Sequence, residues 1–289
     1  MKILFAKTKV RVSLFAMFAL INTQSVLAAD FDFGFKAGFE SFEWEEFDDE
    51  TGQSLLTETG TRFVAGAFIG NTPQLKKKFI YNAEIRNYFG VVDYDGQTED
   101  INTGITTPAT TDTTYTGFNL SGEAGIRTPN TNGSFAWDFT GKLDIDTWVR
   151  NLASGNNEAG EAFGEAQEQY LVFNLKIGTG PAWNAGKWHG RVIVGVKQPI
   201  YTYEFIDNYY TGYPEDIVLH PKGRTSAFLT FNNNIQLSKT LHLKIDGYYD
   251  SYRFDASDVE PIAGENFGIL QPESSQDTYG ILAGLGWKF

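Results

Sequence analysis

Two aspartates are the residues whose type and spacing could do hydrolytic chemistry. Asp144 and Asp146 lie two positions apart, so in a β-strand both carboxylates would face the same side. Such a pair can help to activate water when a histidine lies close enough to accept the proton. The positions two before the three histidines His189, His220 and His242 hold Lys187, Val218 and Thr240. No histidine therefore brings a second carboxylate with it, and ion pairing of the aspartates with Lys142 or Lys244 is the competing interpretation.

The elements that would position these side chains are β-strands. Apolar residues alternate with polar ones in ten runs, as a strand with one apolar face requires. One run sets Phe79 and Ile85 against Glu84 and Arg86. The ten predicted strands cover 31–39, 61–70, 79–92, 114–127, 135–149, 169–178, 188–198, 225–237, 241–253 and 279–289. Two segments, 40–47 and 200–206, could extend neighbouring strands or form short hairpins, so eight or twelve strands remain open.

The gaps that follow even-numbered runs differ in length from those that follow odd-numbered runs. Short gaps follow the even runs, at 71–78, 128–134, 179–187 and 238–240. Long, polar gaps follow the odd runs, at 40–60, 93–113, 150–168, 199–224 and 254–275. Short turns at one end and long loops at the other are typical of transmembrane β-barrels with both termini at the short-turn side.

The first 29 residues have the layout of a secretory signal peptide. Four basic residues precede a short apolar stretch and a small-residue exit at Ala28 and Ala29. We expect cleavage there, leaving 30–289 as one domain. An uncleaved signal anchor is the alternative. Cleavage removes four of the 23 basic residues and none of the 36 acidic ones, which changes the net charge from −13 to −17. This charge argues against nucleic acid as a partner, and the lack of cysteine excludes disulfides.

The last run ends the chain on an aromatic residue with no tail. Its outward side is apolar and its other side is nearly all glycine. The outward set, which we interpret as an assembly signal, includes Tyr279, Ile281, Leu285, Trp287 and Phe289. This strand resembles the closing strand of Gram-negative outer-membrane β-barrel proteins, which their assembly machinery recognises.

The resemblance implies an all-β fold, a transmembrane antiparallel up-and-down barrel of about ten strands in the cell outer membrane. It implies short periplasmic turns and long extracellular loops, and the assembly machinery as a partner during biogenesis. The segments 94–98 and 271–274 resemble those of uncharacterised porin-like proteins. Aromatic pairs at the run ends, such as Trp44 and Trp148, are predicted to form belts at the membrane interfaces.

The polar faces of the strands would line the interior. The predicted lining residues are Glu84, Arg86, Glu123, Asp138, Lys142, Asp144, Asp146, Arg191, Lys197, Lys244 and Asp246. A barrel of this size can be filled by side chains, whereas open channels typify larger ones. A core of paired charges and a narrow pore for ions or small solutes therefore both remain open. Gly280, Gly284 and Gly286 would either leave one wall unobstructed or allow tight packing of a neighbouring arginine or tyrosine.

The predicted long loops are rich in carboxylates, for example Glu46, Glu58, Asp93 and Asp95. They could share divalent cations with the phosphates of lipopolysaccharide, or simply form a solvated acidic surface. Histidine motifs typical of barrel hydrolases are missing: no Asp-x-His accompanies the Asp-x-Asp pair as in omptin proteases, and no His-x-Ser occurs as in barrel deacylases. We therefore expect a non-enzymatic barrel without cofactor or metal, acting as a narrow channel or structural surface protein. An omptin-like or lipid hydrolase and a surface adhesion protein are the alternatives.

Overall fold

The described part of the protein is all-β. The computed structural model describes residues 31–100, 105–131, 133–207, 215–262, 264 and 267–289. The elements in this part of the chain are all strands. In the same residues no helix has the length and hydropathy to cross a membrane.

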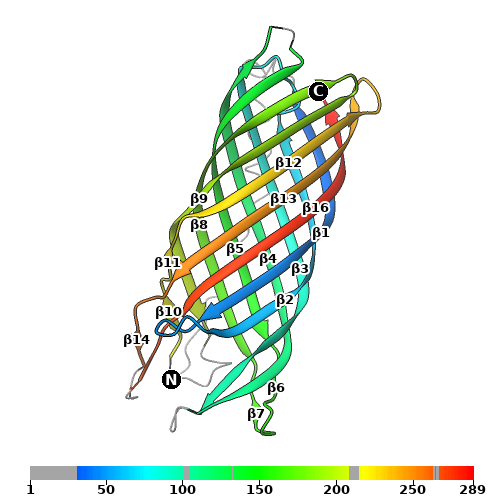
Figure 1. The fold of residues 1–289 in the computed structure, drawn as a ribbon. Coiled ribbons are helices and arrows are strands. Elements are labelled where there is room, and N and C mark those ends of the chain that lie inside the picture. Colours follow the sequence, from blue (N-terminus) through cyan, green and yellow to red (C-terminus); the bar gives the residue numbers. More distant parts are fainter. Residues whose placement is uncertain (1–30, 101–104, 132, 208–214, 263, 265–266) are drawn as a thin grey trace, which may run out of the picture.

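About ten long strands form a closed ring (Figure 1). They are β1 (Asp32–Phe47), β2 (Ser54–Gly70), β3 (Phe79–Asp100), β4 (Ile105–Pro129), β5 (Phe135–Leu152), β8 (Ala166–Ala185), β9 (Trp188–Ile206), β12 (Ser226–Gln236), β13 (Leu241–Asp255) and β16 (Glu273–Lys288). Each pairs antiparallel with its neighbours in this order, and β16 pairs with β1 along the full length of both strands. The predicted antiparallel up-and-down ring of about ten strands is therefore confirmed.

The two ends of the ring differ. The short-turn end carries the connections 71–78, 130–134, 186–187 and 237–240 together with Asp32 and Phe289. The long-loop end carries the other connections and the short strands β6 (Gly155–Asn156), β7 (Ala162–Phe163), β10 (Ile217–Leu219), β11 (Lys222–Gly223), β14 (Glu260–Pro261) and β15 (Gly268–Ile269). In Figure 1 the short-turn end is uppermost and β6, β7 and β14 lie at the opposite end.

The outside of the ring carries an apolar band. Large apolar side chains stand exposed on it, including Phe39 (62% exposed), Leu143 (60%) and Ile281 (69%). Because so much apolar surface is stable only against another apolar phase, this band marks the lipid-facing part of the wall. The band covers only part of each long strand. On β4 the outward residues are apolar from Ile126 to Phe118 and then polar, as at Thr110.

Several predicted strand ends were wrong for one physical reason. The second strand begins at Ser54 rather than 61, the third runs to Asp100, and the fourth covers Ile105–Pro129 rather than 114–127. Beyond the apolar band the outward residues contact water, so the apolar–polar alternation stops although the strand continues. The segments 40–47 and 200–206 extend β1 and β9. Much of the predicted loops 40–60 and 93–113 is therefore strand.

Candidate functional site: the ion-paired lumen

The inward side chains of β5 run from one end of the lumen to the other. In order from the short-turn end they include Asp138, Asp144, Asp146, Trp148 and Arg150. These side chains belong to successive layers of contacts with the surrounding strands, which we call tiers. Strand alternation alone sends these residues inward, since Leu143 and Phe139 on the same strand face outward.

The tier nearest the short-turn end is built on Asp138. Its two carboxylate oxygens accept hydrogen bonds from Arg127 Nε and Nη2, both at 2.7 Å, and Arg191 Nε donates to it at 2.8 Å. Arg191 also pairs with Glu123 at 2.7 Å. The connection 71–78 lies across this tier, because Arg127 Nη1 donates to the Thr72 carbonyl at 2.9 Å. Two cations thus share one fully buried carboxylate.

The next tiers contain lysines paired with carboxylates. Lys36 lies 2.9 Å from Glu84 and 2.7 Å from Asp246, and Arg86 lies 3.3 Å from Glu84. On the opposite wall Lys176 lies 2.7 Å from Asp144 and also pairs with Asp250. Two further lysines complete this second group, since Lys142 contacts Asp144 at 3.3 Å and Lys197 pairs with Asp250.

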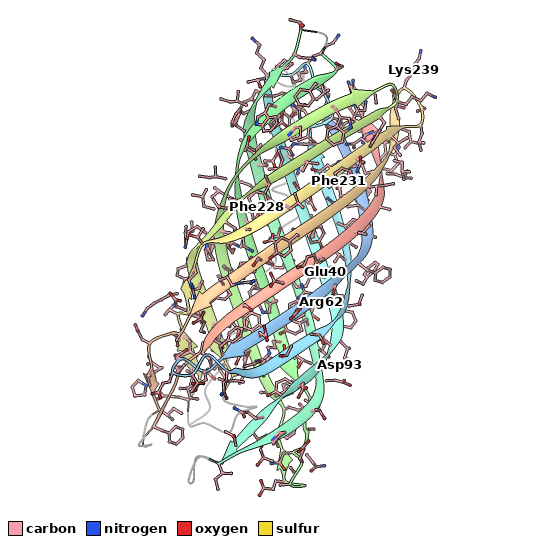
Figure 2. The ribbon with its side chains drawn as sticks, in the orientation of Figure 1. Glu40, Arg62, Asp93, Phe228, Phe231 and Lys239 are labelled. Carbon is pink, nitrogen blue, oxygen red and sulfur yellow. The ribbon has the colours of Figure 1, made fainter. Side chains whose placement is uncertain are left out.

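Asp146 and Glu40 lie in a tier where tyrosines join the ion pairs. The two oxygens of Asp146 accept hydrogen bonds from the Tyr88 and Tyr252 hydroxyls, both at 2.9 Å. Arg62 binds Glu40 at 2.6 Å, and Figure 2 shows these two side chains close together. The guanidinium of Arg62 also lies 4.5 Å from the ring centroid of Tyr88. Burial strengthens both kinds of contact.

The tier nearest the long-loop end surrounds Arg150. This guanidinium binds Glu58 at 2.8 Å and Glu168 at 2.6 Å, and Glu46 lies 3.9 Å away. Predicting Glu46 and Glu58 as loop carboxylates was therefore wrong. Both lie on strands with inward side chains, 7% and 0% exposed, because the strands continue past the apolar band.

Aromatic side chains fill the space around the tiers of Asp146 and Arg150. Trp148 stacks on Tyr170 with ring centroids 4.8 Å apart, and Trp44 packs against both rings. The prediction that Trp44 and Trp148 form an interface belt was wrong, since they are 1% and 2% exposed inside the lumen. Trp44 and Glu46 are two positions apart on one strand, as are Trp148 and Arg150 on another, so the indoles point inward with these charged side chains. Their position near the end of a run did not reveal this.

Little open space remains among these side chains. Two lumenal cavities among the described residues measure about 70 Å³ and 30 Å³. The larger lies between Glu84, Lys142 and Asp246, and the smaller between Arg62, Asp146 and Tyr252. Spaces of this size hold a few waters.

The glycines of β16 are covered rather than open. A methyl group at Gly280 would overlap the Tyr248 ring, and one at Gly286 would overlap the His242 ring. At Gly284 it would meet the backbone of Phe35 and Lys36. The idea of an unobstructed wall was therefore wrong, and the alternative of tight packing by a tyrosine describes Gly280. Tyr248 rests on this glycine while its hydroxyl donates to Glu40.

All predicted lining residues lie on strands of the ring and turn inward, where Glu84, Asp246 and Lys244 share one group and Asp144, Lys142 and Lys197 another. The sequence interpretation missed Lys36, Glu40, Arg62, Arg150 and Asp250. Lys36, Glu40 and Arg62 each lie next in sequence to an exposed outward residue, such as Phe63 beside Arg62, so strict alternation would have identified these three.

The histidines are far from the aspartate pair. His189 and His242 line the short-turn end, while His220 Nδ1 lies 2.9 Å from the Thr202 carbonyl near the long-loop end. Among the described residues, no three acidic or histidine side chains are grouped to hold a metal ion. The arrangement brings opposite charges together throughout the lumen, so buried charges lie beside partners of opposite sign.

The last strand lies against the start of the described part of the chain. Phe289 N donates to the Phe31 carbonyl at 3.0 Å, and the two rings stack with centroids 5.2 Å apart. The outward residues Tyr279, Ile281 and Leu285 are exposed on the apolar band, and Trp287 and Phe289 continue this face to the short-turn end.

These features define the class, since the fold is that of outer-membrane β-barrels. No described protein family matches the sequence, and no curated protein sequence is significantly similar to it. The chain is similar in structure to the outer membrane protease OmpT from Escherichia coli, with a TM-score of 0.68 and 11% identity over 93% of this chain and 99% of that one. It is more distantly similar to the translocator domain of the autotransporter NalP from Neisseria meningitidis, with a TM-score of 0.41 and 11% identity over 95% and 94% of the chains. Of these two, only the likeness to the protease is close enough to show a shared fold.

Proposed function

We propose that this protein is a sealed, non-enzymatic barrel of the outer membrane, with its short-turn end in the periplasm and its long-loop end outside. Its role is structural: it presents the part of the ring beyond the apolar band at the cell surface. The observation that carries the proposal is the continuous set of buried ion pairs from Asp138 to Arg150. Exposed carboxylates toward the long-loop ends of β3 and β4, such as Asp93 and Asp112, then face the medium.

The energetics of these pairs favour a seal over the narrow channel. Separating one partner of a buried pair leaves an uncompensated charge, at a cost of about 3–5 kcal/mol. A solute that crosses the lumen would have to separate pairs in several tiers, including the one in which Arg62 is held by Glu40 and by the Phe42 ring 4.0 Å away. The lumenal cavities of about 70 Å³ and 30 Å³ hold only a few waters.

The contacts of the aspartate pair support the absence of catalysis. Asp144 is 1% exposed and is held by Lys142 and Lys176. Both oxygens of Asp146 accept tyrosine hydroxyls. A general base needs an accessible lone pair directed at water beside the substrate, and neither carboxylate offers one. Paired charges in a barrel core are the simpler role.

Planar-bilayer conductance tests the seal. The folded protein should insert without giving defined current steps, while a general porin added to the same bilayers should conduct. Resistance of the barrel to unfolding in unheated detergent gels would show that the silent sample is folded. Reproducible single-channel steps from the folded protein would contradict the proposal and support the narrow channel.

A further inference from the structure

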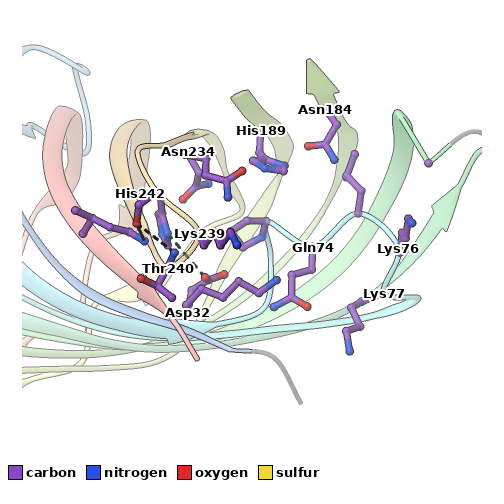
Figure 3. A pocket seen from close by; sticks show the side chains of 17 residues that line it. Asp32, Gln74, Lys76, Lys77, Asn184, His189, Asn234, Lys239, Thr240 and His242 are labelled. Carbon is purple, nitrogen blue, oxygen red and sulfur yellow. Dashed lines mark hydrogen bonds and ion pairs between the residues drawn. The ribbon is translucent and has the colours of Figure 1, made fainter. Parts of the chain in front are cut away.

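A hollow opens at the short-turn end, outside the ion-paired tiers. It has a volume of about 510 Å³ and lies between the connection 71–78 and the turn 237–240 (Figure 3). Small-molecule sites usually measure about 300–1,000 Å³. We call this space, with its lining residues, the vestibule.

The floor of the vestibule contains buried polar atoms without partners among the described residues. These are His242 Nε2 and Asn234 Oδ1, on side chains of residues that are 7% and 5% exposed. His189 Nδ1 and Asn184 Oδ1 share this property and also line the hollow. Native proteins pair nearly all such atoms. These four atoms are closed off from the hollow itself, and His242 Nε2 lies against Gly286, so a polar ligand would pair with them once their side chains turn toward it. Imidazole and amide groups can present donors or acceptors to it.

The rim of the vestibule is basic. Lys76, Lys239 and Lys288 line it as exposed side chains, and Figure 3 shows Lys76 and Lys239 among the side chains around the hollow. Asp32 is the one carboxylate among the described lining residues, and it faces His242 Nδ1 at 3.9 Å. This local sign is opposite to the net charge of −13 for the whole chain, so the vestibule attracts anions that the rest of the surface repels.

We propose that the vestibule binds a short acidic peptide through its free carboxylates. The lysines of the rim supply the charge complementarity. The amides of Asn184 and Asn234 can hydrogen-bond to peptide groups, which a lone ion does not offer. The volume of about 510 Å³ is also far larger than an inorganic anion needs. The site faces the periplasm if the proposed orientation holds, but its binding does not depend on whether the lumen conducts.

Calorimetric titration of the folded protein in detergent micelles tests the site, with triglutamate as the probe. Saturable binding should weaken as salt is added, because the rim charges are exposed and screened. Trilysine should not bind. Inorganic phosphate that displaced triglutamate at equal concentration would overturn the assignment to a peptide, and absence of triglutamate binding would overturn the site.

Two sets of variants locate the binding. The triple change Lys76→Ala, Lys239→Ala, Lys288→Ala removes exposed charges only, and should weaken binding by about tenfold, given a few-fold for each exposed pair. The floor change His242→Leu should weaken binding while leaving its salt dependence unchanged. Lys222→Ala, an exposed lysine at the other end of the ring, is the matched control. Equal affinity of the triple variant and this control would contradict the proposal.

Discussion

At the scale of single residues, Arg62 shows how the lumen is held. Its guanidinium binds Glu40 and lies 4.0 Å from the Phe42 ring centroid and 4.5 Å from that of Tyr88. The same Glu40 also accepts the Tyr248 hydroxyl. One cation therefore connects side chains from β1, β2, β3 and β13. Charge pairing and aromatic packing at this point are one interaction network rather than two.

Replacement of Arg62 by methionine should destabilise the folded barrel by about 3–5 kcal/mol, because it leaves Glu40 buried with its charge uncompensated. Adding Glu40→Gln should restore part of that loss. Urea unfolding in lipid vesicles measures both free energies. The exposed pair of Lys222 and Asp258, where a hydrogen bond from Lys222 lowers the pKa of Asp258, offers the control. Additive effects of the two lumenal changes would argue against a coupled pair.

At the scale of elements, β16 shows why an inward glycine can be essential. Gly280 is the surface on which the Tyr248 ring lies, so its missing side chain is occupied by a neighbour. Alternation predicted that this glycine faces inward. It could not predict what covers it, because Tyr248 lies on β13 and reaches Gly280 through strand register.

Gly280→Ala should destabilise the barrel by about 1–3 kcal/mol, since the added methyl group displaces a packed ring. Gly122→Ala on β4 is the matched control, because nothing lies within 4 Å of the added carbon there. Thermal unfolding monitored by circular dichroism compares the two variants. Equal melting temperatures for both would show that Tyr248 can move away freely.

The same reasoning marks how far the sequence predicts this protein. The periodicity predicted the existence of each long strand and the side that faces inward, and the resemblance to outer-membrane barrels implied the ring of about ten strands. It missed strand ends such as Ser54 and Asp100, because outward residues beyond the lipid band no longer need to be apolar. It missed the specific pairs of the lumen, such as Lys36 with Asp246, because these residues are adjacent only after the ring closes.

At the scale of the whole molecule, the wall is divided into two environments, the apolar band and the polar part of the ring between this band and the long-loop end. A single strand can pass through both environments: β4 runs from Leu120 in the band to Thr110 beyond it. The polar part of the ring keeps its inward packing around Arg150 without any lipid outside. The barrel is thus held from inside along its length and by lipid along only part of it.

This division predicts that an arginine introduced on the outward face of β4 has a different effect on stability inside and outside the apolar band. Leu120→Arg should cost about 2–4 kcal/mol in lipid vesicles, as charges do near the bilayer centre. Thr110→Arg, exposed on the same side of β4, should change the stability little. Equilibrium unfolding in vesicles and in detergent separates the membrane contribution. A similar cost at both positions would show that the band has been placed wrongly.

The pairing of β1 with β16 has a consequence for synthesis. These strands lie at opposite ends of the sequence, yet they form a continuous seam from Asp32–Lys288 to Phe47–Glu273. A chain still being made therefore has two unpaired edges, and each is a template for pairing with other chains. The ring therefore closes only through β16, a strand of sixteen residues. A variant that lacks β16 would keep both edges open, and we expect it to form an aggregation-prone sheet instead of a closed barrel.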